Sequence, residues 1–400
     1  MNTVAGVRPP LRLASIDAYR GLVMLLMMAE VLGFCDVSRA LPDSGFWKFL
    51  CYHQSHVEWV GCSLHDLIQP GFSFLVGVVL PFSIANRLAR GATFGRLARH
   101  AVIRSVLLII LGLFLASLNV LPWRVNVDFG DTLAQIGLAY GFLFPLGFCR
   151  PRSWWIALAV VLLGYWLFFA LYPLPGPDFD YARVGVSNEW LTEHGLKGFA
   201  AHWQINSNPA ARFDFWFLNL FPRENPYLPH KGLTTLNFVP LIGTMILGLM
   251  AGNILRSDRN PWAKVQWLSL AGIAGLGSGW TLGALGVCPV VKSIWTPSWV
   301  LFSGGWCFLF MAAAYILVDI WGQRKLAMPL IIIGMNSIAA YCFSHIFQGL
   351  AFNSFRRVFG WEIFRIFGVA FEPLFYGAVV LLFLWLVLFV MYRLKIFVRI

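Results

Sequence analysis

Long apolar stretches separated by short polar segments run through the whole chain. A helix needs about 20 predominantly apolar residues to cross the roughly 30 Å hydrocarbon layer of a membrane. About ten stretches approach this length, and we expect transmembrane helices near residues 17–35, 64–85, 101–119, 131–149, 153–172, 233–255, 262–286, 298–320, 327–347 and 371–392. The pattern therefore predicts an all-α fold, a polytopic transmembrane helix bundle that forms a single domain over residues 1–400.

Two features of this pattern interrupt the simple bundle. Pro70 and Pro81 fall inside the second expected span, and breaks of this kind are tolerated where protein or a watery cavity satisfies the freed backbone groups. The longest connection, 173–232, is rich in Pro, Asn and aromatic residues. Loops of this length are usually functional or disordered. The aromatic content favours an ordered cap over the outer mouth of the bundle, with a plain spacer as the alternative.

Composition supports a membrane protein. Hydrophobic residues make up 59% of the 400 residues and charged residues only 12%, and the mean hydropathy is +0.71. A soluble domain carries roughly a quarter charged residues, so this chain has too few charges to cover a water-facing surface. The net charge of +12 is dispersed in short clusters between apolar runs. Because it does not form one basic stripe, we expect no nucleic-acid partner.

The basic residues predict the orientation, since short cytoplasmic loops are enriched in Lys and Arg. If the N-terminus is cytoplasmic, the inside segments hold one clear loop acid, Asp258, and these basic residues: Arg8, Arg12, Arg87, Arg90, Arg96, Arg99, Arg104, Arg150, Arg152, Arg256, Arg259, Lys264, Arg324, Lys325, Arg393, Lys395 and Arg399. An even number of spans then places both termini inside. The first apolar stretch lacks a small-residue cleavage site, so we expect a retained helix rather than a signal peptide.

Ionisable groups inside a membrane are functional candidates by default. Asp17 and Arg20 are three residues apart in the first expected span, so they share a helix face and can pair. The two residues have two interpretations of equal weight. They form a structural ion pair, or they contact an anionic ligand from the cytoplasmic side. Glu30 lies near the outer end of the same span, where a carboxylate needs a partner or water.

A second group of polar residues lies at the outer membrane boundary. His53, His56, Glu58, His65 and Asp66 fall within one short segment. A neutral imidazole can take and return a proton near neutral pH, and a carboxylate such as Asp66 or Glu58 can orient it.

The same segment leaves other interpretations open. Cys51, His53, His56 and His65 are all metal-ligand types, but their spacing matches no standard zinc pattern, so we expect no metal. Loop histidines without a role are a further alternative. Cys51 and Cys62 fall in an expected outside loop, where an oxidising compartment would allow a disulfide between them.

Two more polar stretches occur late in the chain. Lys292 and Trp295 mark the outer end of the eighth expected span, as interfacial anchors or as contacts to an acceptor. In the ninth, Asn336, Tyr341 and Ser344 share one helix face with His345 at its outer end. Such a stripe faces the bundle interior, either for hydrogen bonds between helices or to line a passage.

Six strings in this order resemble the heparan-alpha-glucosaminide N-acetyltransferase-like membrane acyltransferases, including their bacterial relatives. They are RLASIDAYRG (12–21), HVEWVGCSLHDLIQPGFSFLVG (56–77), RSVLLIILGL (104–113), GLTTLNFVPLIGTMILGLMAG (232–252), VKSIWTPSWVLFSGGW (291–306) and GMNSIAAYCFSH (334–345). The resemblance implies an enzyme of the inner (plasma) membrane that takes an acetyl group from cytoplasmic acetyl-CoA. It would deliver that group to an amine or hydroxyl of a sugar or glycan on the far side.

The resemblance also implies roles for single residues. His56 falls on the catalytic histidine of the family's His-x-x-Trp-x-Gly string, and Asp66 on the aspartate of its Asp-Leu-x-x-Pro string. Asn336 is expected to stabilise an oxyanion. The expected cofactor contacts are Asp17, Arg20 and Arg104, and the expected acceptor contacts are Lys292, Trp295, Glu30 and His345.

The chain departs from the family pattern at two places. Glu30 stands where the family often has Asn, and Leu133-Ala134-Gln135-Ile136 lacks the Arg of the usual Leu-Gln-Arg-Ile string. His56 could act as a general base or as a nucleophile that carries the acetyl group, and both routes stay open. The rival function is a transporter or flippase for a lipid-linked or small sugar, although no internal repeat supports it. Membrane lipid is an expected partner, and family members can form homodimers.

Overall fold

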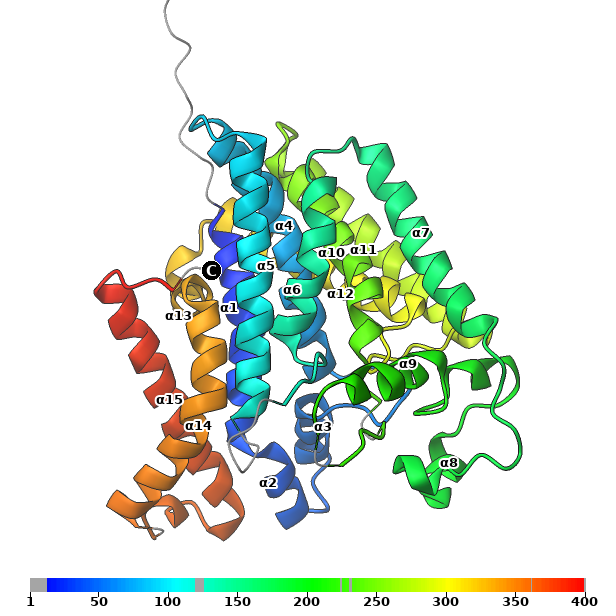
Figure 1. Cartoon of the computed structure of the whole chain (residues 1–400). Coiled ribbons are helices and arrows are strands. Elements are labelled where there is room, and N and C mark those ends of the chain that lie inside the picture. Colours follow the sequence, from blue (N-terminus) through cyan, green and yellow to red (C-terminus); the bar gives the residue numbers. More distant parts are fainter. Residues whose placement is uncertain (1–12, 119–125, 224, 230–231, 361, 399–400) are drawn as a thin grey trace, which may run out of the picture.

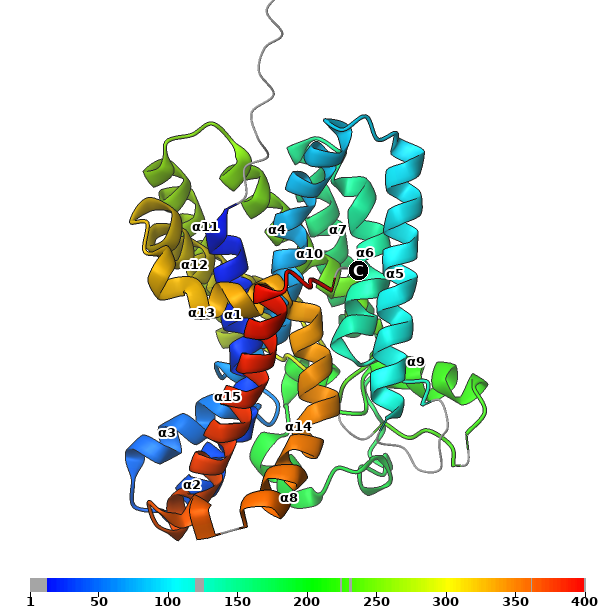
Figure 2. The same cartoon turned by 90° about the vertical axis from the view of Figure 1, so that its left-hand side faces the viewer.

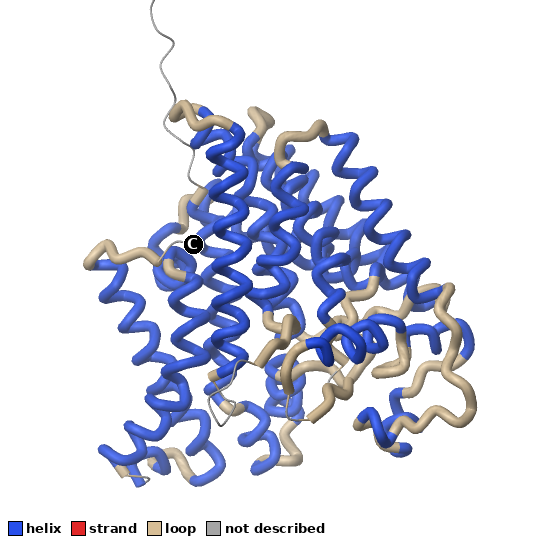
Figure 3. Tube along the Cα trace, in the orientation of Figure 1, coloured by secondary structure: helices blue, strands red, loops and turns tan. Residues whose placement is uncertain are grey.

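The computed structural model describes residues 13–118, 126–223, 225–229, 232–360 and 362–398, and every regular element within them is a helix (Figure 3). The predicted all-α class is therefore confirmed for the described chain. The long helices are α1 (Ala14–Met28), α4 (Ile68–Leu88), α5 (Phe94–Ser117), α6 (Thr132–Leu146), α7 (Pro151–Ala170), α10 (Phe238–Arg256), α11 (Pro261–Ala284), α12 (Pro297–Tyr315), α13 (Arg324–Met335), α14 (Ser337–Phe359) and α15 (Glu372–Arg393).

Among the described residues, fewer helices are able to cross a membrane than the about ten that the sequence predicts. Seven are long and apolar enough, and the count is eight if the pair 324–335 and 337–347, bent by 70°, forms one broken span. Helix α6 has 15 residues and is shorter than a full crossing. Helix α11 has 24 residues but is rich in Gly and is not one of the seven. The chain is a multi-pass membrane protein with seven to eight candidate spans in the part that the structure describes.

Helices α4 and α10 form the buried centre of the bundle because glycines let their backbones touch. A Cβ atom on Gly248 would lie 1.9 Å from the carbonyl oxygen of Phe74, and one on Gly252 would lie 2.2 Å from that of Val78. From the other side, a Cβ on Gly77 would lie 2.0 Å from the carbonyl oxygen of Met245. Small residues spaced four apart are the usual means of such close packing in membranes. These contacts fix the helix that carries one wall of the site.

Two ends of the bundle differ in chemistry. The turns α4–α5, α6–α7 and α10–α11 lie together at the top of Figure 1, and their basic residues define what we call the basic end: Arg87, Arg90, Arg96, Arg99, Arg150, Arg152, Arg256 and Arg259. At the bottom lie the short helices α2 (Phe34–Ala40), α3 (Gly45–Gln54), α8 (Asn188–His194) and α9 (Pro209–Phe217), which define the loop end (Figures 1 and 2). Arg8, Arg12 and Arg399, which the sequence assigned to the cytoplasmic side, lie outside the described residues.

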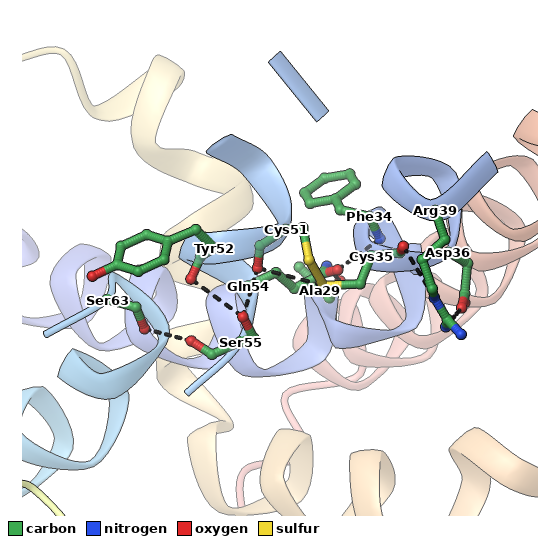
Figure 4. The surroundings of a disulfide bond; sticks show 10 residues. All are labelled: Ala29, Phe34, Cys35, Asp36, Arg39, Cys51, Tyr52, Gln54, Ser55 and Ser63. Carbon is green, nitrogen blue, oxygen red and sulfur yellow. Dashed lines mark hydrogen bonds and ion pairs between the residues drawn. A yellow bond between two sulfur atoms is a disulfide. The ribbon is translucent and has the colours of Figure 1, made fainter. Parts of the chain in front are cut away.

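A disulfide joins α2 to α3 at the loop end, between Cys35 and Cys51 (Figure 4). The disulfide between Cys51 and Cys62 that the sequence left open is not formed, since Cys62 is a free thiol. The reason is tertiary: α2 and α3 pack against each other and bring the Cα atoms of Cys35 and Cys51 to 4.5 Å. Gln54 adds a second tie, because its side chain bonds the backbone of Ala29 and Phe34 at 2.7 Å each (Figure 4).

Candidate functional site

His56 lies just after α3, beside Asp66 and Lys292. Its Nδ1 is 2.7 Å from Oδ1 of Asp66, and Nζ of Lys292 is 2.9 Å from Nδ1 and 3.4 Å from Nε2. Lys292 Nζ is also 3.2 Å from Oδ1 of Asp66. The structure therefore brings together three residues that the sequence singled out, from segments more than two hundred positions apart.

A short backbone contact holds these segments in register. Val60 and Val291 form an antiparallel bridge, and Gly61 N donates to the carbonyl oxygen of Val290 at 3.0 Å. Trp59, which follows His56 in the sequence motif, is buried and donates from Nε1 to the carbonyl oxygen of Trp203 at 3.2 Å. The bridge and this aromatic anchor position Lys292 beside the His56 ring.

Asp66 lies in the short helix η2 (His65–Leu67), and its side chain is 1% exposed. Its second oxygen, Oδ2, accepts hydrogen bonds from Ser63 N at 3.0 Å and Val57 N at 3.3 Å. A buried carboxylate with this many donors is held as an anion. It can orient His56 through Nδ1 and leave Nε2 facing the cavity.

Burial lowers the pKa of Lys292, and the neighbouring Asp66 opposes that shift. His56, Asp66 and Lys292 form one polar cluster, since each lies within hydrogen-bond distance of the other two. Cys62 is not a rival nucleophile, since burial raises the pKa of its thiol to about 12.

A second pair of a histidine and a carboxylate lies beside the first. His65 Nε2 is 2.6 Å from Oε1 of Glu30, and the ring centroids of His65 and His56 are 4.6 Å apart. Glu30 belongs to the short helix η1 (Ala29–Leu32) that follows α1. The sequence pointed to Glu30 and to a histidine cluster, but it gave no sign that these two residues meet.

Both pairs line a cavity of about 690 Å³ at the loop end, which we call the outer cavity. Its opposite wall carries Asp131, Tyr341 and His345. Tyr341 donates its hydroxyl hydrogen to Asp131 Oδ2 at 2.8 Å, and Nδ1 of His345 donates to the carbonyl oxygen of Tyr341 at 2.9 Å. Sequence reasoning missed Asp131. Its place before the apolar run 132–146 was a helix N-cap signal, and it does cap α6 by accepting from Leu133 N.

A smaller cavity of about 380 Å³ opens toward the basic end, and we call it the basic cavity. Asp17 and Arg20 line it, and their predicted ion pair is confirmed at 3.4 Å. Arg87 and Arg104 contribute two more guanidinium groups. Arg104 lies over the Tyr140 ring at 4.8 Å, and its buried Nε has no hydrogen-bond partner among the described residues.

Three helices, α1, α4 and α14, contribute side chains to the walls of both cavities. On α4, the residues spaced three and four apart from Gln69 to Val79 form one face, and this face passes from the outer cavity into the basic one. Phe72 lines both cavities. The wall residues on each helix are, in order from the basic end, Asp17, Arg20, Met24 and Met27 on α1; Arg87, Val79, Val76, Phe72, Gln69 and Ile68 on α4; and Ser337, Ile338, Tyr341, Ser344 and His345 on α14.

The structure does not bring two of the expected site residues to His56. Asn336 is buried at the break between α13 and α14, where its side chain bonds the backbone of Ile396 at 3.0 Å and Val398 at 3.1 Å. Its amide is thus used to hold the C-terminal segment and does not line the outer cavity. Trp295 is buried and donates from Nε1 to Thr244 Oγ1 at 3.2 Å, which gives it a packing contact in place of an acceptor contact.

The set of residues considered as metal ligands is not assembled. The sulfur of Cys51 is bonded to Cys35, and Nδ1 of His53 accepts a hydrogen bond from Leu64 N at 3.2 Å. Within the described ranges, no group of three or more His, Cys, Asp or Glu side chains is placed to hold a metal ion.

The described part of the 173–232 loop is folded and lies against the outer cavity. It contains α8, the short helix η4 (Gly198–Trp203) and α9. Trp190 donates from Nε1 to Oε2 of Glu58, a cavity residue, at 3.3 Å. Asp214 Oδ2 accepts from Thr235 N at 2.9 Å, and this bond fixes the segment that leads into α10.

The comparisons with known proteins agree with the resemblance in the motifs. No family model matches the chain. It is 26% identical to heparan-alpha-glucosaminide N-acetyltransferase of Homo sapiens over 380 residues, 85% of this chain and 53% of that protein. The match to the Mus musculus protein of the same name is 25% over 366 residues, 82% of this chain and 53% of that protein. The chain is a distant relative of these N-acetyltransferases. It spans about half the length of the curated relatives it matches.

Asp214 predicts a pH-dependent stability for the folded part of the 173–232 loop. Burial raises its pKa from the ordinary value of 3.8 to about 7. A raised carboxyl pKa in the folded state means that the charged form is disfavoured by folding, so stability is lost as the pH rises from about 4 through about 7. We expect the wild-type melting temperature in detergent to fall between about pH 5 and about pH 8, and Asp214→Asn to remove this part of the fall. Parallel pH curves for the two proteins would contradict the assignment.

Proposed function

We propose that the protein is an integral-membrane acyltransferase that moves an acetyl group from acetyl-CoA, bound from the basic end, to an amine or hydroxyl of a sugar or glycan at the loop end. The observation that carries the proposal is a pair of cavities, one rich in arginine and one with the His56–Asp66 pair, that are lined by the same faces of α1, α4 and α14 and share Phe72. Acetyl-CoA is too polar to cross a bilayer freely. A passage through the bundle lets its acyl end reach His56 while its nucleotide end stays in water.

The basic cavity suits the donor. Coenzyme A carries phosphate groups, and Arg20, Arg87 and Arg104 present guanidinium groups that bind phosphate through charge-assisted hydrogen bonds. The unpartnered Nε of Arg104 supports a ligand contact there, because a buried donor without an acceptor is costly.

His56 supplies the chemistry at the other end. With Nδ1–H donated to Asp66, the Nε2 lone pair is free to take a proton from the acceptor or to attack the thioester itself. Lys292 lies 3.4 Å from Nε2 and can stabilise a tetrahedral oxyanion, the role first expected of Asn336. The carboxylates of Glu58 and Asp131 and the imidazole of His345 offer hydrogen-bond acceptors to a sugar.

We infer the orientation of the protein in the membrane from one feature at each end of the bundle. Short Arg-rich turns are retained on the cytoplasmic side, and disulfides persist in oxidising compartments. The basic end would then face the cytoplasm, with both termini, and the Cys35–Cys51 end would face the outside of an inner (plasma) membrane. A transporter or flippase for a lipid-linked sugar would use the same passage without an acetyl donor.

The catalytic role of His56 is tested with His56→Ala in purified protein and radiolabelled acetyl-CoA. We expect transfer to an amino sugar to fall by about 10²-fold or more, the contribution of a positioned base. Acetyl-CoA binding, measured as a thermal shift, should remain, because His56 lies in the other cavity. Unchanged transfer would remove His56 from the mechanism, and no binding of acetyl-CoA by the wild type would favour the transporter.

The donor site is tested with Arg104→Ala, with Arg99→Ala as the matched control. Both arginines lie on α5, but only Arg104 lines the basic cavity. Loss of a hydrogen bond to a charged group costs about 1.5–3 kcal/mol, so the Kd for acetyl-CoA should rise about tenfold or more in Arg104→Ala. Equal affinities of the two variants would exclude Arg104 from the donor site.

A native cysteine tests the orientation. Cys149, in the turn between α6 and α7 at the basic end, is the exposed free cysteine among the described residues. A membrane-impermeant maleimide should label it in inverted membrane vesicles and not in intact cells. The reverse result would place the basic end outside and overturn the proposed direction of transfer.

A further inference from the structure

The outer cavity holds two histidine–carboxylate pairs in contact with each other. In one, His56 meets Asp66, and in the other, His65 meets Glu30 at 2.6 Å. The two rings lie 4.6 Å apart with an interplanar angle of 54°. One pair is enough for a single proton transfer, so the second pair requires its own explanation.

The two pairs differ in how their carboxylates meet water. The side chain of Asp66 is 1% exposed and is enclosed by the donors of Ser63 and Val57. The side chain of Glu30 is 47% exposed, although its partner His65 is only 6% exposed. The side chain of His56 is 57% exposed, so the first pair meets the cavity through its imidazole and the second through the carboxylate of Glu30. Of the two carboxylates, Glu30 is therefore the one that can meet a cationic acceptor directly and pass a proton on to solvent.

If the acceptor is an amine, each of the two histidine–carboxylate pairs can have its own role in proton transfer. At neutral pH a primary amine of ordinary basicity is an ammonium ion and cannot attack a thioester until it loses a proton. The overall reaction, R–NH3⁺ + CH3CO–S–CoA → R–NH–CO–CH3 + CoA–SH + H⁺, moves two protons. One goes to bulk water and the other to the sulfur of the leaving thiolate.

We propose that the His65–Glu30 pair is the site that removes the first proton from an ammonium acceptor. His65 or Glu30 takes that proton and releases it to the outside, which leaves the nitrogen lone pair free. The nitrogen then forms its bond to the acetyl carbon as the carbon–sulfur bond breaks. His56 carries the second proton from the nitrogen to the thiolate. This assignment rests on the proposed acyltransferase function and narrows its acceptor to an amine.

The surroundings of Glu30 fit this role. The other titratable groups that act on it are His56, in the segment after α3, and His345, on α14. Lys292, in the 285–296 connection, also interacts electrostatically with Glu30, and its ammonium lies 3.2 Å from Oδ1 of Asp66. Glu58 and Asp131 complete the lining of charged groups in the outer cavity. Carboxylates thus outnumber the lysine there, and this favours a cationic acceptor.

The decisive experiment is the pH profile of Glu30→Gln, with purified full-length protein, radiolabelled acetyl-CoA and D-glucosamine as the amine probe. If the pair deprotonates the acceptor, the variant can use only amine that is already neutral. We expect kcat/KM to fall about 10²-fold near pH 6.5. The ratio of the wild-type kcat/KM to that of the variant should then fall about tenfold per pH unit, until the pH reaches the pKa of the amine. His65→Asn should show the same profile, and Glu30→Asp should restore part of the rate at low pH.

Glu58→Gln is the matched control, because this carboxylate lines the same cavity but is bonded to Trp190 and to no histidine. Its pH profile should keep the wild-type shape even where its rate is lower. A constant fold-loss at all pH values in Glu30→Gln and His65→Asn would mean a merely structural role and would overturn the inference while leaving the acyltransferase intact. A wild-type protein that binds acetyl-CoA but acetylates no acceptor would instead remove the proposed function itself. Should one variant not fold, as judged by gel filtration, the profile of the other decides.

Discussion

The buried carboxylate of Asp66 is the constraint on which the rest of the site depends. An ionised carboxylate that is 1% exposed is stable only if donors surround it. Asp66 obtains these donors from the backbone of Val57 and Ser63, from the ring of His56 and from the ammonium of Lys292. These groups come from separate stretches of chain. Satisfying one charge therefore folds the His56 segment and the 285–296 connection onto the end of α4.

Loops carry this site, and several ties reduce their freedom. The Val60–Val291 bridge aligns the two segments, and Trp59 is anchored to Trp203 of the cap. Behind them, the disulfide of Cys35 and Cys51 joins α2 to α3. Functional side chains need supporting contacts that lock their positions. At the loop end, these contacts fix the position of His56, just as regular helix packing fixes the residues inside the bundle.

The helices have a different role, which is to position the two cavities within an apolar bundle. Backbone contact at glycines holds α4 against α10 and α1 against α13, since a Cβ on Gly334 would lie 1.9 Å from the carbonyl oxygen of Asp17. Such contacts leave little room for adjustment. Faces of α1, α4 and α14 line both the basic cavity and the outer cavity. Phe72 lies where the two cavities meet.

The sequence alone determined the features that depend on neighbours along the chain. Apolar runs predicted a helical membrane protein, Arg-rich turns marked one end, and the Asp17–Arg20 pair followed from helix periodicity. The motif resemblance pointed to His56, Asp66 and Lys292 as site residues, and the structure brings them together. The first three results required only local composition and spacing, whereas the site residues rested on the resemblance to a known family.

Only the tertiary structure decided which distant residues meet, because a contact between residues of different segments leaves no periodic trace in a single sequence. Helix packing paired Cys51 with Cys35, and it placed Glu30 against His65 and Asp131 against Tyr341. It also directed the Asn336 side chain to the backbone of residues 396–398, away from His56. Among the described residues, the candidate spans number seven to eight rather than about ten, since α6 has 15 residues, α11 is not among the candidates, and the apolar run around Asn336 is bent by 70°.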